Sequence, residues 1–423
     1  MPRLPGLVVT DHLFTVPLDH SRPDGETIEV LGREVVATGK ADAKLPWLIY
    51  FQGGPGLAAP RPSSASGWIE RATRDYRVLL LDQRGTGRST AITARTAASK
   101  TPAELAAYLR LFRADSIVRD AELIRAQLSP DEPWTSLGTS YGGFITLTYL
   151  SLAPEGLKTC LITGGLPGLD ATADDVYRRT YPRVVAKNDA FYTRYPEDVE
   201  RVRRIADYLR DHDVRLPNGD QLDVRRFQLL GVGLGMGSAA ETLHWLIDEA
   251  WDGDVLDDAF LHTVMNKTAF GIEPLWAAIH ELIYAQGDHL TNWAAARLRP
   301  AEFSPDQDRL LFTGEMVFPW MFEQISGLRE FAEAANLLAA EGDWPRLYDV
   351  DRLAANDVPV AAAIWHEDMY VDADLSLQTA ARIGNITTWI TNEWQHDGGS
   401  ASGGSVLDRL LQLAADLPPV SGG

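Results

Sequence analysis

The sequence predicts an α/β fold: a mostly parallel sheet covered by helices on both faces, with a helical cap inserted into it. Two observations lead to this prediction. Continuous apolar runs, typical of strands buried on both faces, alternate with helical periodicity up to residue 168. The alternation then stops and resumes only after residue 352. We therefore expect a core formed by residues 1–168 and 353–423, and a cap formed by residues 169–352.

The expected core elements follow one another in a regular order. Two antiparallel strands open the chain, and buried strands joined by right-handed crossovers follow them. The strands are expected at 12–17, 28–38, 45–51, 76–81, 133–137, 157–163, 358–365 and 386–390, and helices at 102–128, 144–150 and 406–417. The Gly/Ser-rich stretch 398–404 is expected to be a flexible loop. Amphipathic helices such as Val199 to Arg210 and Ala239 to Ala250 are expected in the cap.

The composition limits the kinds of partner. The chain has 423 residues, 45% hydrophobic and 23% charged, as in a globular protein with more than one core or a large insertion. A net charge of −20 argues against nucleic acid and anionic membranes as partners. The chain shows neither a signal-peptide core nor an apolar run of membrane-spanning length, which predicts a cytoplasmic protein. Association into a homo-oligomer is left open.

Cysteine and histidine usage gives no indication of a cofactor. The lone cysteine, Cys160, excludes a disulfide within the chain and is expected to be buried in a strand. No Cys/His cluster has zinc-ligand spacing, and His366 has no second histidine at helical spacing. We therefore expect neither a metal nor a cofactor.

A candidate nucleophile lies between a strand and a helix. Ser140 is at the centre of Gly138-Thr139-Ser140-Tyr141-Gly142-Gly143, directly after the expected strand 133–137. A tight strand-to-helix turn strains the backbone at the serine and needs small neighbours, because strand and helix approach closely there. The N-terminus of the following helix places backbone N–H groups beside a developing oxyanion. A glycine turn without a catalytic role is the alternative interpretation.

A serine nucleophile needs a base and a group that orients that base. Both should follow strand ends at the same edge of the sheet. His396, after the last strand, is the candidate base. Asp368, after the penultimate strand, is the preferred acid, with Glu367 and Asp372 as competitors. The order serine, acid, histidine is the one expected for an α/β-hydrolase sheet.

An oxyanion hole requires two backbone donors. The N–H of Tyr141 directly follows the nucleophile and is one candidate. The other is expected in Gly53-Gly54-Pro55-Gly56, where missing side chains let a carbonyl approach the backbone. Gly54 is preferred and Gly53 is the next choice. A tight turn without a catalytic donor is the alternative.

These motifs together resemble the proline iminopeptidase (prolyl aminopeptidase) family of α/β-hydrolase serine exopeptidases. The resemblance spans nearly the whole chain and is weakest in the cap. Two departures are Gln52, where family members usually have His, and Thr139, where they often have Gly. The motifs are Gly53-Gly54-Pro55-Gly56, Asp82-Gln83-Arg84-Gly85-Thr86-Gly87-Arg88-Ser89, the segment around Ser140, Asp368-Met369-Tyr370-Val371 and Asn392-Glu393-Trp394-Gln395-His396-Asp397-Gly398.

The resemblance implies removal of an N-terminal residue, preferably proline, from peptides. Without a metal, a cationic amino group must be recognised by desolvated carboxylates. Family members use two cap glutamates for this, a role carried over to Glu281 and Glu315 as a hypothesis. Salt-bridged helix carboxylates are the alternative. Tyr284, Trp320 or Phe322 would pack on a prolyl ring, although aromatic residues more often belong to the core.

Two alternative functions stay open. The first is another hydrolase on the same scaffold, namely an esterase, an epoxide hydrolase or a peptidase that releases longer N-terminal units, and the second is a non-catalytic binding protein. Epoxide hydrolysis is disfavoured because its nucleophile is usually Asp. The glycine-rich stretch 231–238 lacks the glycine spacing and lysine of a phosphate loop, so it is interpreted as a flexible cap turn. Arg84 is expected to pair with an acid in a structural turn at the sheet edge.

Overall fold

A nine-stranded sheet forms the centre of the core in the computed structural model, which describes residues 3–418. The strand order is β1-β2-β3-β5-β4-β6-β7-β10-β11, and the strands from β5 to β11 run parallel. The expected N-terminal antiparallel pair and the parallel sheet are thus confirmed. The strands are β1 (Arg3–Leu4), β2 (Leu7–Pro17), β3 (Thr27–Ala37), β4 (Trp47–Phe51), β5 (Arg77–Asp82), β6 (Trp134–Thr139), β7 (Leu157–Thr163), β10 (Val360–Trp365) and β11 (Ile386–Thr391).

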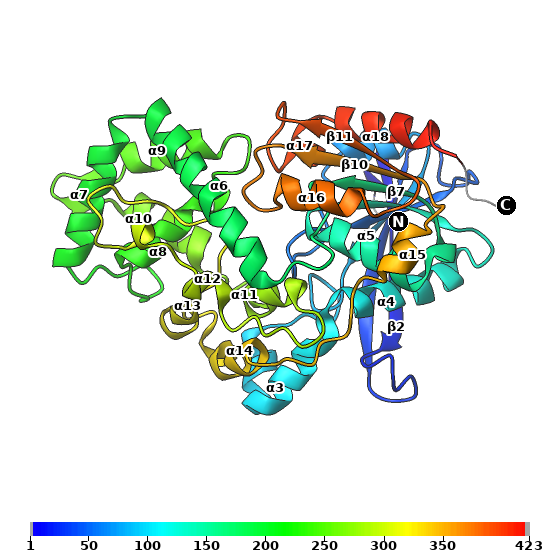
Figure 1. The fold of residues 1–423 in the computed structure, drawn as a ribbon, viewed down its shortest axis with the longest axis horizontal. Helices are drawn as coiled ribbons and strands as arrows, with labels where there is room; N and C mark the ends of the chain where they lie inside the picture. Colours follow the sequence, from blue (N-terminus) through cyan, green and yellow to red (C-terminus); the bar gives the residue numbers. More distant parts are fainter. Residues whose placement is uncertain (1–2, 419–423) are drawn as a thin grey trace.

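Helices bury both faces of this sheet (Figure 1). Successive side chains of a strand point to opposite faces, so Leu48 packs toward α1 and α18 while Ile49 packs toward α4 and α5. The expected helix 102–128 is interrupted, since Arg113 is extended and precedes α4. The core helices are α1 (Gly67–Ala72), α2 (Ala94–Ala98), α3 (Pro102–Leu109), η1 (Arg110–Phe112), α4 (Ala114–Leu128), α5 (Tyr141–Leu152), η2 (Pro154–Gly156), α15 (Val350–Ala354), α16 (Ala373–Ala380), α17 (Gly398–Ala401) and α18 (Ser405–Ala415).

A second, helical lobe lies beside the sheet and appears in green and yellow in Figure 1. Its long first helix, α6, is tied to the core because Arg179 and Arg183 pair with Asp372, which caps α16. The hairpin β8 (Trp251–Asp252) and β9 (Val255–Leu256) was not expected. The cap boundaries 169 and 352 stay a prediction. The helices are α6 (Ala173–Arg194), α7 (Asp198–Asp211), α8 (Val224–Gln228), η3 (Leu229–Gly233), α9 (Ala239–Asp248), α10 (Asp258–Thr268), α11 (Pro274–Ile279), η4 (His280–Tyr284), α12 (Ala294–Arg297), η5 (Ala301–Phe303), α13 (Pro319–Gln324), η6 (Arg329–Phe331) and α14 (Ala332–Ala339).

The C-terminal Gly/Ser stretch corrects one expectation. The prediction of a flexible loop over 398–404 is wrong for its first part, which forms α17. The carbonyl of Asp397 accepts the N–H groups of Ser400 and Ala401 at 2.9 and 2.8 Å. A Cβ on Gly398 would lie 2.8 Å from the Trp365 ring, so glycine here allows helix and strand to pack closely.

The expectation that Arg84 pairs with an acid is confirmed. Arg84 is fully buried and donates to Asp120 at 2.6 and 2.7 Å, as expected of a structural turn.

Within residues 3–418, none of the helices combines the length and apolarity that crossing a bilayer requires.

Candidate active site

Ser140 occupies the turn between β6 and α5 in a backbone conformation that non-glycine residues rarely adopt. Its φ is 55° and its ψ is −124°. Its N–H donates to Thr163 on the neighbouring strand at 3.0 Å, and its carbonyl accepts from Gly143 at 2.8 Å. These bonds compensate part of the cost of the strained conformation, which is of order 1–3 kcal/mol. The strain lifts the serine above the carboxyl edge of the sheet, as its sequence context predicts.

Glycines allow the surrounding chain to approach this turn. A Cβ on Gly142 would lie 2.0 Å from the carbonyl oxygen of Phe51, at the end of β4. A Cβ on Gly53 would lie 2.9 Å from the Cβ of Ser140. Real Cβ atoms do not approach so closely, so only glycine permits the loop after β4 to pass over the serine.

His396 and Asp368 form a buried hydrogen-bonded pair. Nδ1 of His396 lies 2.6 Å from Oδ2 of Asp368, and Oδ1 of Asp368 accepts the N–H groups of Tyr370 and Val371. The competing acids lie elsewhere. The Glu367 residue is exposed, and Asp372 caps α16 by accepting the Leu375 N–H. The backbone donors hold one carboxylate oxygen and leave the other for the imidazole.

Ser140 and His396 both line one cavity of about 360 Å³ at the carboxyl edge of the sheet. Gly53 and Gly54 lie on its wall, and Tyr141, the first residue of α5, directly follows Ser140. From the cap, Glu315 and Met236 reach the same cavity. Its apolar wall is formed by Tyr50, Leu57, Pro60, Trp68, Leu137, Val406 and Leu407. A nucleophile, a base and backbone donors around one space suit acyl transfer.

The environment shifts the pKa values of His396 and Glu315, which line the cavity with Ser140. Burial alone would lower the pKa of His396, but the charge and hydrogen bond of Asp368 outweigh it and raise the pKa above its usual value. Burial raises the pKa of Glu315 to about 7, even though the nearby His396 works to lower it. Glu315 therefore changes charge within the range where a hydrolase operates.

Glu281 lies outside the catalytic cavity. It is 5% exposed, and its two carboxylate oxygens accept the N–H groups of Ala294 and Ala295 at 3.0 and 2.9 Å. Burial raises the pKa of Glu281 to about 7, against the lowering effect of these backbone bonds. This carboxylate therefore stabilises the N-terminus of α12.

The predicted aromatic contacts also lie outside that cavity. Tyr284 borders a different cavity and packs edge-on against Tyr177 at 6.3 Å between ring centroids. Burial raises the pKa of both phenols, and the charges of Glu281 and Glu315 add to the rise in each. The two tyrosines thus lie within electrostatic reach of both cap glutamates. Trp320 instead stacks near Phe318 and beneath the guanidinium of Arg225.

Sequence reasoning missed the role of the glycine-rich cap stretch 231–238. The carbonyl of Gly235 accepts the N–H of His396 at 3.0 Å, and the N–H of Gly237 donates to Asp397 at 3.0 Å. The stretch does turn, but its backbone is bonded to the loop that carries the histidine. The only signal was the glycine density itself. A Cβ on Gly235 would lie 2.3 Å from the ring of Tyr370, a contact that no local pattern predicts.

Two curated relatives match almost the whole chain. Proline iminopeptidase from Aeromonas sobria is 50% identical over 98% of this chain and 98% of its own. Proline iminopeptidase aneH from Aspergillus aculeatus is 36% identical over 95% of this chain and 93% of its own. The chain belongs to the proline iminopeptidase family. A family model described as alpha/beta hydrolase fold also matches residues 46–245.

Solved structures similar to this proline iminopeptidase family member have low sequence identity and add nothing about its function. A 2-hydroxy-6-oxo-6-phenylhexa-2,4-dienoate hydrolase from Rhodococcus sp. strain RHA1 is 13% identical, with a TM-score of 0.44, over 96% of this chain and 100% of that one. A proline iminopeptidase-related protein from Thermus thermophilus is 14% identical, with a TM-score of 0.41, over 96% of this chain and 98% of that one.

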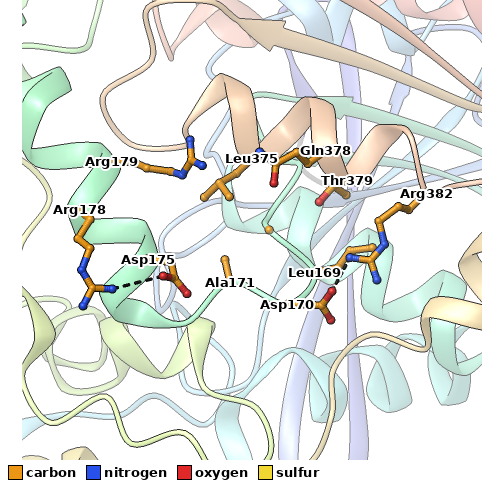
Figure 2. Close-up of a pocket in the computed structure, with 11 residues that line it drawn as sticks. Leu169, Asp170, Ala171, Asp175, Arg178, Arg179, Leu375, Gln378, Thr379 and Arg382 are labelled. Carbon is orange, nitrogen blue, oxygen red and sulfur yellow. Dashed lines mark hydrogen bonds and ion pairs between the residues drawn. The ribbon is translucent and has the colours of Figure 1, made fainter.

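A larger cavity, of about 540 Å³, lies between α6 and α16 and contains none of the predicted site residues of this family member (Figure 2). Its charged groups are paired, two of the arginines with aspartates of the same cavity and Arg179 with Asp372 outside it. Arg178 bonds to Asp175 at 3.3 Å, and Arg382 bonds to Asp170. The candidate nucleophile Ser140 and the candidate base His396 line the smaller cavity instead.

One described group of side chains has the spacing of metal ligands. Glu197, Asp198 and His244 bring ligand atoms within 4.8 Å of one another in the cap. His244 already bonds to Asp198 at 2.8 Å, and Arg201 pairs with the other oxygen of Asp198 at 3.0 Å. An arginine within the group repels a cation, so an ion-pair network is the better description.

Proposed function

We propose that this protein is a serine exopeptidase that releases an N-terminal proline, or a similar residue, from peptides. Membership of the proline iminopeptidase family supports the proposal. The observation that carries it is the buried pair of His396 and Asp368, whose histidine lines the same cavity as Ser140 and Glu315. This combination provides acyl-transfer chemistry beside a carboxylate able to bind an amino group.

In this mechanism Ser140 attacks the carbonyl carbon of the first residue while His396 accepts the hydroxyl proton. Asp368 keeps the imidazole in one tautomer and stabilises the imidazolium. The N–H groups of Tyr141 and Gly54, with Gly53 as the alternative, hold the oxyanion. His396 then gives the proton to the leaving amine, and water hydrolyses the acyl-enzyme by the same steps in reverse.

Selection for the amino terminus is assigned first to Glu315. Its carboxylate borders the reacting groups, and burial makes an ion pair with a substrate ammonium stronger than in water. Glu281 is the second candidate, because Tyr177 and Tyr284 are within electrostatic reach of both glutamates. Tyr284 is the preferred ring to pack on proline, whereas Trp320 has less support because it lies under Arg225.

The partner is accordingly a peptide with a free N-terminus. We also propose that the enzyme acts in the cytoplasm. Its lone cysteine, Cys160, is buried, and burial raises the pKa of the thiol to about 12, so the fold does not depend on an oxidising compartment.

The test compares prolyl-arylamide, N-blocked prolyl-arylamide, alanyl-arylamide and a short-chain ester on the wild type and on Ser140→Ala. We expect the wild type to prefer prolyl-arylamide and to reject the blocked form. Ser140→Ala should lose about 10⁴- to 10⁶-fold in kcat with an unchanged far-UV spectrum. Preference for the ester or the blocked substrate would favour an esterase, and turnover by Ser140→Ala would remove the nucleophile assignment.

A further inference from the structure

Two cavities meet at one side chain of the glycine-rich cap stretch. Met236, which is 36% exposed, lines both the catalytic cavity and a second cavity of about 290 Å³ inside the cap. The second cavity is formed mainly by η3, α9 and the end of α10. Its wall includes Leu230, Ala239, Thr242, Leu243, Leu246 and Lys267.

The position of Met236 relative to the histidine is fixed by its neighbours. The carbonyl of Gly235 accepts the backbone N–H of His396, and the N–H of Gly237 donates to the side chain of Asp397. Met236 is therefore held between two residues that are bonded to the loop of the proposed base. The same methionine contributes to the wall of the cap cavity.

The chemistry of peptide cleavage places the leaving peptide on this side. His396 must give its proton to the leaving nitrogen, so that nitrogen lies next to the imidazole when the bond breaks. Everything downstream of the scissile bond extends from that point. Met236 lines the same cavity as His396 and also lines the cap cavity, so a chain extending from the imidazole past Met236 would reach the cap cavity.

Lys267 gives this cavity a charge that suits such an occupant. It lies in the last turn of α10 and is exposed. Within residues 3–418, its ammonium makes no hydrogen bond or ion pair, and none of the side chains lining the cavity carries a carboxylate. The chain as a whole has a net charge of −20, so an unpaired cation beside an apolar cavity stands out. A short leaving peptide brings both apolar side chains and a C-terminal carboxylate.

We propose that the cap cavity is the binding subsite for the leaving peptide, with its apolar wall receiving the residues after the cleaved bond and Lys267 pairing with the C-terminal carboxylate of short substrates. The inference rests on the proposed exopeptidase function and specifies its substrate class: short peptides with a free C-terminus. An exposed ion pair is worth up to about 1 kcal/mol, so the selectivity expected from Lys267 is about three- to fivefold.

The experiment measures kcat/KM for three substrates: Pro-Leu-Leu with a free C-terminus, the same peptide as the C-terminal amide, and prolyl-arylamide. In Lys267→Gln we expect a loss of about three- to fivefold for the free acid only, and we expect high salt to shrink that loss. Lys158→Gln is the matched control, because Lys158 is also exposed but lies at the start of β7. It should leave all three values unchanged.

A second variant tests the apolar part of the subsite. Thr242 is exposed on α9 and lines the cavity, so Thr242→Phe fills space there without disturbing buried contacts. It should raise KM for both tripeptides and leave prolyl-arylamide unaffected.

Equal effects of Lys267→Gln on acid and amide, or of Thr242→Phe on tripeptides and arylamide, would overturn the subsite, as would no effect at all. If the wild type cleaves no prolyl substrate, both the proposed function and the subsite that rests on it are wrong. Turnover of prolyl-arylamide separates these two failures.

Discussion

The ring of Tyr370 lies 4.6 Å from the imidazole of His396, centroid to centroid. The Tyr370 hydroxyl donates to the carbonyl of Val232 at 2.5 Å and accepts the N–H of Gly235 at 3.2 Å. The backbone N–H of Tyr370 donates to Asp368 at 2.8 Å. One residue therefore connects the proposed acid, the proposed base and the glycine-rich cap stretch.

Tyr370→Phe keeps the ring and removes both hydroxyl bonds to the cap. Because these bonds hold the stretch that supports His396, we expect kcat for prolyl-arylamide to fall about tenfold while KM changes less than about twofold. Steady-state kinetics would measure this split. Unchanged kcat, or a rise in KM alone, would show that Tyr370 does not act on the base, and a thermal melt would check that the fold persists.

Asp368→Asn should both slow the reaction and move its pH dependence. By analogy with other Ser-His-Asp enzymes, kcat should fall about 10⁴-fold. Asp368 raises the pKa of His396, so its neutralisation should lower that pKa and let the residual activity persist to lower pH. A pH–rate profile of kcat/KM measures the shift. An acid limb at higher pH than in the wild type would contradict the electrostatic role given to Asp368, and Glu367→Gln serves as the control at an exposed neighbour.

Glu315→Gln should separate amino-terminal substrates from simple esters. Loss of a charged hydrogen-bond partner should lower kcat/KM for prolyl-arylamide about 10- to 100-fold and leave a short-chain ester within about twofold. Equal losses on the two substrates would remove the proposed role.

The pH profile gives a second readout of Glu315. Burial raises its pKa to about 7, so the carboxylate that attracts the ammonium forms only as pH rises through that value. For prolyl-arylamide, His396 and Glu315 must both lose a proton, and the wild-type acid limb should be steeper than with the ester. In Glu315→Gln the acid limbs of the prolyl-arylamide and ester profiles should have the same slope. If the wild-type slopes already agree, Glu315 does not titrate in this range.

Glu281→Gln should act mainly on stability. At about pH 8, above its raised pKa, the carboxylate accepts two backbone N–H groups, and an amide has only one oxygen to offer them. A buried donor left without a partner costs about 1–3 kcal/mol in the free energy of unfolding. Urea unfolding at that pH would measure the change, with exposed Glu333→Gln on α14 as the control. A stable variant with a raised KM for amino-terminal substrates would instead give Glu281 a direct part in binding.

Local sequence patterns are sufficient to predict the order and type of the core elements and the candidate catalytic residues. Apolar runs have the period of buried strands, and Ser140 has its glycines within three positions on either side, so both are local patterns. Asp368 and His396 could be proposed because the carboxyl ends of parallel strands share one edge. Sequence favoured Asp368 but left Glu367 and Asp372 as competitors, since all three follow the same strand.

Which side chains share a cavity depends on the three-dimensional fold. Glu315 lines the same cavity as His396, whereas Glu281 accepts a hydrogen bond from the N-terminus of α12. The sequence around the two glutamates did not predict this difference. Part of the Gly/Ser stretch forms α17, and the stretch 231–238 is hydrogen-bonded to the loop that carries His396. The physical reason is that cap packing depends on contacts between residues far apart in the chain, such as Gly235 with Tyr370, and no local periodicity encodes such contacts.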